Sequence, residues 1–454
     1  MKGFIYSLAL MPLFVSCGGK LDELDLQSLS TNDEPEEVIA KISTVGTLDT
    51  SFGSGSGYVV TGSGTGDDDM NASTVDSDGK IIVVGSVDNG VSSGIDMAVW
   101  RFNTDGTLDT SFGGTGLVTY TGSGAFSDVA YAVSIDDEGR VVVAGLIGKS
   151  STDSDMAVWR ITTSGSLDTN FAGGDGVFSH DGAGGVTGEQ EFAKGVEVDS
   201  VGKILVGGSA DTVSGSQWTP EAVVWRLNAD GTLDFAFNGV GYVGGISGEV
   251  NSFAVTSEGD ILVGGFTGIM KETLNVWKYT STGAIDTSFG GGDGIVEYDP
   301  SAGFVFDASY ALTLDKNENI VVVGETGNDM TILRYTPSGV LDTSFGTGGV
   351  VTHDVNGGTS DVGRAVIIDH EDNILIAGKS DNSSDDDMVI WKFESSGVID
   401  TSFASGVGYM TIDGTAGGGD DEALGISFDE VGNILVSGRS FNGSDHDAVI
   451  WRIK

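Results

Sequence analysis

Apolar and polar residues alternate along this chain in short runs, and no stretch keeps the 3.6-residue period of an amphipathic helix. One stretch illustrates the pattern. Its runs at 130–136, 140–146, 156–161 and 177–179 are each typical of a β-strand, and turn residues such as Asp137-Glu138-Gly139 separate them. The pattern therefore predicts units of four short antiparallel strands joined by tight turns.

The element Leu-Asp-Thr-Ser-Phe, or a close variant, occurs seven times, with successive copies starting 52 to 66 residues apart. The copies are Leu48–Phe52, Leu108–Phe112, Leu167–Phe171, Leu233–Phe237, Ile285–Phe289, Leu341–Phe345 and Ile399–Phe403. A repeat of this length is typical of solenoids and propellers. Four strands repeated seven times predict an all-β fold, a seven-bladed β-propeller of four-stranded antiparallel blades.

The order of the strands also predicts how the ring closes. The chain opens with a lone outer strand near Tyr58–Thr61, and it ends at Lys454 just after a third strand. We expect Tyr58–Thr61 to pair beside Ala448–Ile453, so that the N-terminal strand completes the last blade. Closure of this kind removes the open sheet edges that favour aggregation.

The repeated element, written Gly-x-Leu-Asp-x-x-Phe-Gly, resembles that of the delta-60 repeat family of bacterial propeller proteins. The resemblance covers Ile42 to Lys454, and the fourth copy departs most, with Phe235-Ala236 in place of Thr-Ser. It implies the propeller fold and carries no activity that can be transferred to this chain.

Two further sets of residues recur once per repeat and are expected to be structural. A tryptophan, replaced by Leu333 in the fifth repeat, recurs in the third strand, and we expect it to pack between blades rather than to form a glycan platform. The basic residue that follows it, and the aspartate of the Leu-Asp element, predict one ion pair in each blade. The tryptophans are Trp100, Trp159, Trp225, Trp277, Trp391 and Trp451. The basic residues are Arg101, Arg160, Arg226, Lys278, Arg334, Lys392 and Arg452, and the aspartates are Asp49, Asp109, Asp168, Asp234, Asp286, Asp342 and Asp400.

The N-terminal residues predict export. Lys2 and the apolar run Phe4–Val15 are typical of a signal peptide, and Phe14-Val15-Ser16-Cys17 resembles a bacterial lipobox. Residues 1–17 are thus interpreted as a lipoprotein signal peptide with lipidation at Cys17, an ordinary signal peptide with an incidental cysteine being the alternative. Residues 18–41 are interpreted as an acidic flexible tether and 42–454 as the propeller. We expect a bacterial cell-envelope protein, anchored through its N-terminal lipid, with the outer membrane or cell surface favoured by Gly18.

The charge of the chain limits its partners. With 67 acidic residues against 21 lysines and arginines, the formal net charge is −46, and no basic stripe offsets it. Phosphate backbones would be repelled, so we expect no nucleic acid partner. Such acidity suits a soluble surface that attracts cations.

Acidic residues recur at two positions that fall on one rim of the predicted propeller, where chains enter the first and third strands. The first row is Asp68, Asp128, Glu191, Gly248, Asp307, Asp361 and Asp421; the second is Asp96, Asp155, Glu221, Thr273, Asp329, Asp387 and Asp447. The fourth repeat lacks both acids, which suggests that the two positions share a partner. A shared calcium ion is one interpretation, and the twelve acids are its candidate ligands. Capping of the neighbouring loop backbone by each carboxylate is the other interpretation.

No catalytic constellation stands out. The four histidines, His180, His353, His370 and His446, fall in different places, and no nucleophile elbow, phosphate loop or zinc-protease motif is present. Trp218, in the insertion 217–220 of the third repeat, is a candidate contact for a protein or glycan partner, although it could equally cover its own loop. We therefore expect a monomeric, non-catalytic binding scaffold that uses its acidic rim, with calcium as its one candidate cofactor. The alternative is an extracytoplasmic hydrolase or lyase that uses rim carboxylates.

Overall fold

A computed structural model describes residues 45–63, 66–90, 94–122, 126–185, 187–212, 220–267, 273–299 and 307–454, with the backbone alone at 307. The chain divides into two units, Met1–Lys41 and Ile42–Lys454, and every described residue belongs to the second. The predicted signal peptide with Cys17, the predicted tether and the candidate contact Trp218 lie outside the described residues. In the described residues, no helix combines the length and the apolar character that a membrane span requires.

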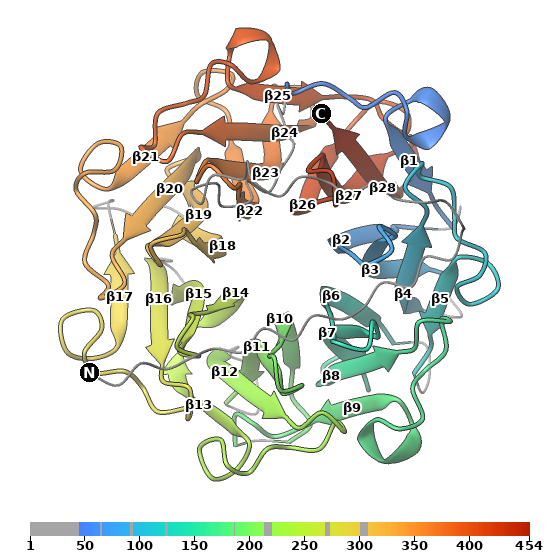
Figure 1. Cartoon of the computed structure of the whole chain (residues 1–454), viewed down its shortest axis with the longest axis vertical. Helices are drawn as coiled ribbons and strands as arrows, with labels where there is room; N and C mark the ends of the chain where they lie inside the picture. The colour runs from blue at the N-terminus through green and yellow to red at the C-terminus, as the bar shows by residue number, and fades with distance from the viewer. Residues whose placement is uncertain are drawn as a thin grey trace, which may run out of the picture. The chain divides into compact units, whose positions relative to one another are not determined.

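The second unit is a ring of seven four-stranded antiparallel sheets around a central axis (Figure 1). Blades 1 to 3 contain β2 (Asp69–Val75), β3 (Ile81–Asp88), β4 (Ile95–Phe102), β5 (Leu117–Tyr120), β6 (Asp128–Ile135), β7 (Val141–Gly148), β8 (Ser154–Ile161), β9 (Val177–His180), β10 (Glu191–Val198), β11 (Ile204–Asp211), β12 (Pro220–Leu227) and β13 (Tyr242–Ser247). Blades 4 and 5 contain β14 (Glu249–Val255), β15 (Ile261–Thr267), β16 (Thr273–Tyr279), β17 (Ile295–Tyr298), β18 (Asp307–Leu314), β19 (Ile320–Thr326), β20 (Asp329–Tyr335) and β21 (Val350–His353). Blades 6 and 7 contain β22 (Asp361–Ile368), β23 (Ile374–Asp381), β24 (Asp386–Phe393), β25 (Tyr409–Ile412), β26 (Asp421–Phe428), β27 (Ile434–Phe441), β28 (His446–Ile453) and β1 (Tyr58–Thr61).

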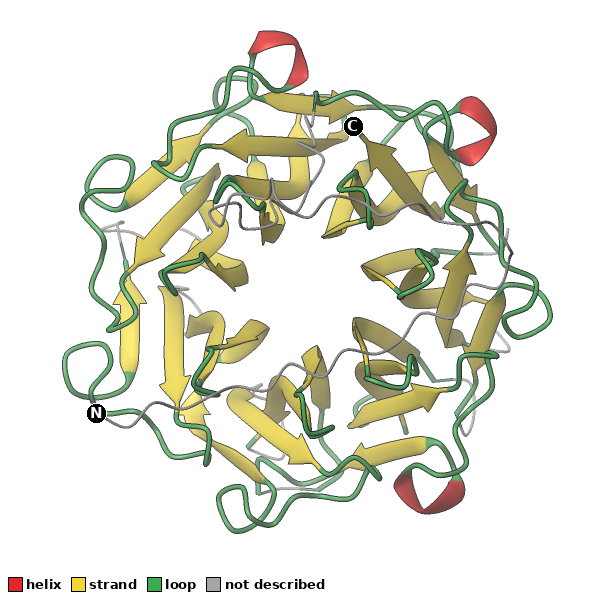
Figure 2. Cartoon of the chain, viewed as in Figure 1, coloured by secondary structure: helices red, strands yellow, loops and turns green. Residues whose placement is uncertain are grey.

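The seven-bladed architecture expected from the repeat is confirmed. We name the strands of a blade A to D from the axis outward, so that β6, β7, β8 and β9 are the A, B, C and D strands of blade 2. These four strands coincide with the four predicted runs to within two residues at each end. Helix is confined, in the described residues, to three short 3-10 turns at Gly53–Gly55, Ala172–Gly174 and Ala404–Gly406, drawn in red in Figure 2.

Ring closure also follows the prediction. β1 pairs antiparallel with β28, and the register places Tyr58 opposite Trp451 and Thr61 opposite Ala448. The strand order β1-β28-β27-β26 makes the N-terminal strand the outermost strand of blade 7. The backbone just before β1 continues the seal, since the amide of Gly46 donates a hydrogen bond of 2.6 Å to the carbonyl of Lys454.

The predicted ion pair is present in all seven blades, with nitrogen–oxygen distances between 2.6 and 3.3 Å. In blade 1 the Nε of Arg101 lies 3.0 Å from Oδ2 of Asp109, while the other carboxylate oxygen of Asp109 accepts from the amide and hydroxyl of Ser111. The aspartate is thus saturated with donors. These donors hold the pKa of the Asp109 carboxyl down at about 2 against the effect of burial.

The same element joins each blade to the next. Nη1 of Arg101 donates to the carbonyl of Thr163 in blade 2 at 2.7 Å, and its guanidinium lies over the ring of Phe112, 4.6 Å from the ring centre. The amide of Gly113 donates to the carbonyl of Ser164, also in blade 2, at 2.9 Å. The Leu-Asp-x-x-Phe-Gly element is therefore a structural clamp between neighbouring blades, which explains its repetition.

The hydrophobic core lies between blades rather than at the centre. It consists of seven clusters, and each cluster takes buried side chains from two neighbouring blades. All six repeated tryptophans are at most 1% exposed, as the packing interpretation predicts. Burial on this scale leaves the two faces of the disc and the channel along its axis as the surfaces available for function.

Candidate functional site

The first row of acids caps the connections that cross from the D strand of one blade to the A strand of the next. Oδ2 of Asp128 accepts from the amide of Gly122 at 2.5 Å, and its Oδ1 accepts from Gly148 at 3.2 Å. Glu191 accepts from Gly182 and Ala183, and Asp361 from Val355. Asp68 accepts from the amides of Ser63 and Asp88, and Asp421 from that of Thr415. Backbone capping, one of the two interpretations of this row, is therefore realised at these five residues.

Burial makes some of these carboxyls unusually basic. Desolvation raises the pKa of Asp128 and of Asp421 to about 6, and it also raises the pKa of Asp68 and Asp361. Neighbouring carboxylates add to the effect at Asp68, where the charge of Asp447 acts in the same direction.

The second row lies at the start of the C strands, and three of its members have separate polar partners. Asp96 accepts from Nδ2 of Asn89 at 2.6 Å, Asp155 pairs with Lys149 at 3.0 Å, and Asp387 accepts from Asn382 at 3.1 Å. Burial raises the pKa of Asp329 and Asp387. Glu221 and Asp447 also belong to this second row. In the first row, the side chain of Asp307 is not among the described parts of the chain.

The two acids of one blade are not close neighbours, although their paired loss in blade 4 suggested that they share a partner. Within blade 2, Asp128 and Asp155 flank Ile147 on the intervening strand, so their backbones are two strand spacings, about 10 Å, apart. At Asp68, Asp128 and Asp361 the C-strand acid of the preceding blade is close enough to act on the carboxyl. A side chain at Gly62 would meet the carboxylates of both Asp68 and Asp447, and the charge of Asp96 raises the pKa of Asp128.

The paired loss in blade 4 therefore does not reflect a partner shared by Gly248 and Thr273. The hydroxyl groups of Thr273 and Thr267 instead form a hydrogen bond of 2.9 Å, and Nδ2 of Asn275 donates to the Thr267 hydroxyl, also at 2.9 Å. Neutral groups therefore replace the second-row acid in blade 4. The adjacent blades keep their acids Glu221 and Asp307. In the described residues, no three His, Cys, Asp or Glu side chains are grouped as a metal site would require.

The two faces of the disc differ in charge. The connectors between D and A strands and between B and C strands form what we call the acidic rim. In their described parts Lys149 is the only lysine or arginine, whereas exposed acids include Asp67, Asp181, Asp354, Asp413 and Asp420. The opposite face carries the clamp arginines together with basic residues in its turns, such as Lys80, Lys203 and Lys316. Cations are thus concentrated on one face.

The histidines do not converge. His180 lies 3.5 Å from Glu191 and packs against Tyr242, while His353 packs against Tyr409 three blades away. His370 lies in an A-to-B turn, and His446 pairs with Asp67 at 3.0 Å on the acidic rim.

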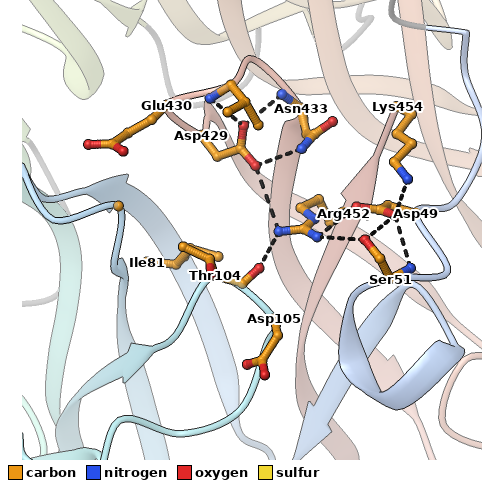
Figure 3. Close-up of a pocket in the computed structure, with 12 residues that line it drawn as sticks. Asp49, Ser51, Ile81, Thr104, Asp105, Asp429, Glu430, Asn433, Arg452 and Lys454 are labelled. Carbon is orange, nitrogen blue, oxygen red and sulfur yellow. Dashed lines mark hydrogen bonds and ion pairs between the residues drawn. The ribbon is translucent and has the colours of Figure 1, made fainter.

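A pocket of about 630 Å³ lies between blades 7 and 1 on the face opposite the acidic rim (Figure 3). It contains the clamp pair of Arg452 and Asp49, together with Lys454. A smaller pocket of about 270 Å³, lined by the equivalent Arg160, occupies the same position between blades 2 and 3. The feature belongs to the repeated architecture, so we assign it a structural role.

The central channel contains residues that the sequence analysis missed. A cavity of about 440 Å³ there is lined by the A strands of all seven blades, and its polar side chains include Asn71, Tyr131, Lys194, Tyr310 and Arg364. Unlike the tryptophans and the clamp, these residues differ from blade to blade. The sequence signal that could have identified them is that the residue at this one position of the A strand changes from repeat to repeat.

Comparison with known proteins supports the fold and repeat type. Five segments, 77–112, 139–171, 202–237, 319–345 and 372–403, match the family described as "Domain of unknown function (DUF5122) beta-propeller". Each segment runs from an A-to-B turn to the phenylalanine of the clamp, so the matched part excludes the A strands and the channel residues. The chain is therefore a β-propeller repeat protein. No curated protein matches it.

The chain also has weak similarity to solved structures. Sqt1 from Chaetomium thermophilum is 13% identical with a TM-score of 0.45, over 84% of this chain and 82% of that one. A protein from Lactobacillus plantarum is 10% identical with a TM-score of 0.43, over 83% and 99%. The extracellular domain of a hybrid two component system from B. thetaiotaomicron is 13% identical with a TM-score of 0.44, over 87% of this chain and 41% of that one.

Proposed function

We propose that this protein is a non-catalytic binding scaffold of the bacterial cell envelope, which presents the acidic rim of its propeller to a cationic partner. The observation that carries the proposal is the unequal distribution of charge between the two faces. In a chain with 67 acids and 21 lysines and arginines, the clamp and the turns of the opposite face use most of the described cations. The rim is left with uncompensated negative charge, which attracts and orients positively charged surfaces.

Two features favour binding over catalysis. The two rows of rim acids extend over six of the seven blades at equivalent positions, whereas catalysis requires a few groups placed around one reacting atom. The A-strand acids are also occupied as acceptors of backbone amides, for example Asp128 with Gly122 and Gly148. A partner surface or several cations would contact the exposed acids between these caps.

The proposal includes export and lipid anchoring of a monomer. It rests on the lipobox-like residues before Cys17 and on the acidic segment 18–41, which would act as a flexible spacer. Substitution of Cys17 by Ser in the full chain should move the protein from the membrane fraction to the soluble fraction of cells. Continued membrane retention of that variant would overturn the anchoring role.

The binding proposal is tested with a defined cationic probe, an oligolysine peptide, in a calorimetric titration of the propeller. A rim variant, Asp181→Asn with Asp354→Asn and Asp413→Asn, removes three exposed charges. A matched variant, Asp78→Asn with Asp137→Asn and Glu258→Gln, removes three from the opposite face. We expect the rim variant alone to weaken binding, and equal weakening by both variants would contradict a rim-specific site.

Calcium is distinguished from a protein partner in the same system. Anything that binds only the folded state raises its melting temperature. Melting curves with calcium and with chelator, at constant ionic strength, should differ if the rim carries a metal site, and the difference should disappear in Asp128→Asn with Asp96→Asn. Identical curves would mean that the rim does not bind calcium, and binding of a cationic partner would remain the proposed function.

A further inference from the structure

The A strand of every blade contains a β-bulge at one equivalent position. Pairing between the A and B strands shifts register there in all seven sheets. The residue inside each shift is Asn71, Tyr131, Lys194, Asn251, Tyr310, Arg364 or Leu424, in blade order. A bulge re-aims the side chain of the extra residue, and all seven line the central cavity. Figure 1 shows the seven A strands around this axis.

The order of these residues has a period of three blades, which the fold does not require. An asparagine, a tyrosine and a cation follow one another in blades 1 to 3 and again in blades 4 to 6. The contacts repeat as well. Asn71 donates to the carbonyl of Ala130 at 2.8 Å, and Asn251 donates to that of Ser309 at 2.9 Å. The Nζ of Lys194 lies 3.4 Å from the ring centre of Tyr131, and Cζ of Arg364 lies 4.2 Å from that of Tyr310.

The two cations differ in their ion pairing. Arg364 binds Glu422 at 2.9 Å, and Arg439 holds the other oxygen of Glu422 at 2.8 Å. Lys194 contacts the rings of Tyr131 and Phe192 but makes no ion pair with a described acid. Each of the other described lysines and arginines has such a pair.

An unpaired cation inside so acidic a chain is an exception that needs a reason. Burial lowers the pKa of Lys194 to about 8, since the charged ammonium is poorly solvated there. The neighbouring Tyr131 hydroxyl remains protonated over the same range, because burial raises its pKa to about 12. The charge of Glu249 partly offsets the lowering of the Lys194 pKa and that of Arg364 adds to it, and no carboxylate forms an ion pair with Lys194 in the described residues. The channel wall therefore offers an ammonium and a phenol, both hydrogen-bond donors, at a cation without an ion-pair partner.

We propose that Lys194 and Tyr131 form the anion-binding end of a small-molecule site in the central channel, which takes the carboxylate or phosphate group of a small organic anion. The cavity volume of about 440 Å³ is in the range of small-molecule sites. An anion at Lys194 supplies the missing ion pair, and the tyrosine rings and Asn251 contact the rest of the molecule. This site is separate from the acidic rim and does not depend on the partner proposed for it.

The binding of an anion stabilises the charged lysine, so it should raise the pKa of Lys194. Reductive ¹³C-methylation keeps the charge of lysines and allows each to be titrated by NMR, with the Lys194 signal assigned by its loss in Lys194→Met. Titrations are run without ligand and with succinate, inorganic phosphate or the neutral succinamide as probes. The propeller is used intact.

We expect succinate or phosphate to raise the pKa of Lys194 by about one unit, which corresponds to about tenfold tighter binding to the protonated form. If only succinate or only phosphate raises the pKa of Lys194, that result identifies the anionic group as a carboxylate or a phosphate. Succinamide should have no effect, and the rim variant should respond as the unsubstituted protein does. Lys316, on the opposite face and paired with Asp372, is the internal control. An unchanged Lys194, or equal shifts at Lys194 and Lys316, would overturn the proposal.

Discussion

Nη2 of Arg452 lies 2.6 Å from Oδ2 of Asp49, although 403 positions of the sequence separate these two residues. The pair does for blade 7 what Arg101 and Asp109 do for blade 1, but it joins the two ends of the described chain. Together with the pairing of β1 and β28 it closes the ring. The clamp is thus both a repeated interblade contact and the closing contact of the fold.

Asp49→Asn should destabilise the propeller by about 3 kcal/mol, because it leaves the buried guanidinium of Arg452 without its counter-charge. The carboxylate of Asp49 also accepts from Lys454 at 2.5 Å and from Ser51. Asp286→Asn is the matched control in blade 4, where the partner is Lys278 and the pair is more exposed, and it should cost about 1 kcal/mol or less. Urea unfolding measures both values, and equal losses would contradict a special role at the seam.

Gly165→Ala should be much more destabilising than Gly139→Ala. Both glycines have positive φ, +83° and +74°, so alanine costs about 1–2 kcal/mol at either position. A Cβ on Gly165 would also lie 2.2 Å from the amide nitrogen of Gly113 in the neighbouring blade, whereas one on Gly139 meets only Thr163 at 3.4 Å. The overlap should add about 1–3 kcal/mol in a thermal or urea unfolding measurement. Similar losses of stability in the two variants would show that the neighbouring blades move apart at Gly165 at little cost.

Stability should be greatest near pH 4–5 rather than at neutral pH. Burial raises the pKa of Asp128, Asp211 and Asp421 to about 6, above the value of about 4 for the unfolded chain. The folded state therefore binds more protons between pH 4 and 6, and stability falls as the pH rises through this range. The pKa of Asp109 is instead lowered to about 2, so its contribution is lost as the pH falls from about 4 towards 2.

Melting temperatures recorded across this range measure the effect. Asp128→Asn with Asp421→Asn should remove most of the decline between pH 4 and 6 while leaving the loss of stability below pH 4 in place. A double variant with an unchanged decline would mean that these two carboxyls do not cause it.

Lys194→Met should stabilise the ligand-free protein at pH 7. The pKa of Lys194 is about 8 in the folded state and about 10.4 in an unfolded chain, so the folded state disfavours the charged form. Stability of the unsubstituted protein should rise between these two pH values, and the advantage of the variant should disappear above pH 10.4. Thermal unfolding at pH 7 and above pH 10.4 checks this, with Lys316→Met as the exposed control. A loss of stability at pH 7 would mean that Lys194 has a structural partner.

The features predicted from the sequence are those that the repeat makes periodic. Seven copies of one element with alternating strands led to the blade number, and the lone strand at Tyr58–Thr61 led to closure. Recurrence of Trp159, Arg160 and Asp168 at constant spacing predicted core packing and ion pairs, because a property needed by every blade must repeat.

What the sequence did not predict depends on contacts between blades or on departures from the repeat. The neighbour of Asp128 is Asp96 of the preceding blade, a relationship that the linear order of a single repeat does not contain. Lys194 and Tyr131 are likewise one repeat apart. The alternation of apolar and polar residues along an A strand does not reveal the β-bulge that turns these two side chains towards the channel. Comparison of equivalent positions between repeats would have identified the channel ring as the variable position.

Hydrogen exchange on the intact propeller, with and without bound oligolysine, shows whether the acidic rim is the binding face. We predict slower exchange in the D-to-A connectors, including residues 181–185, 354–360 and 413–420, and no change in the A-to-B turns at 76–80 and 136–140. Protection confined to those turns, or spread equally over both faces, would contradict binding at the rim.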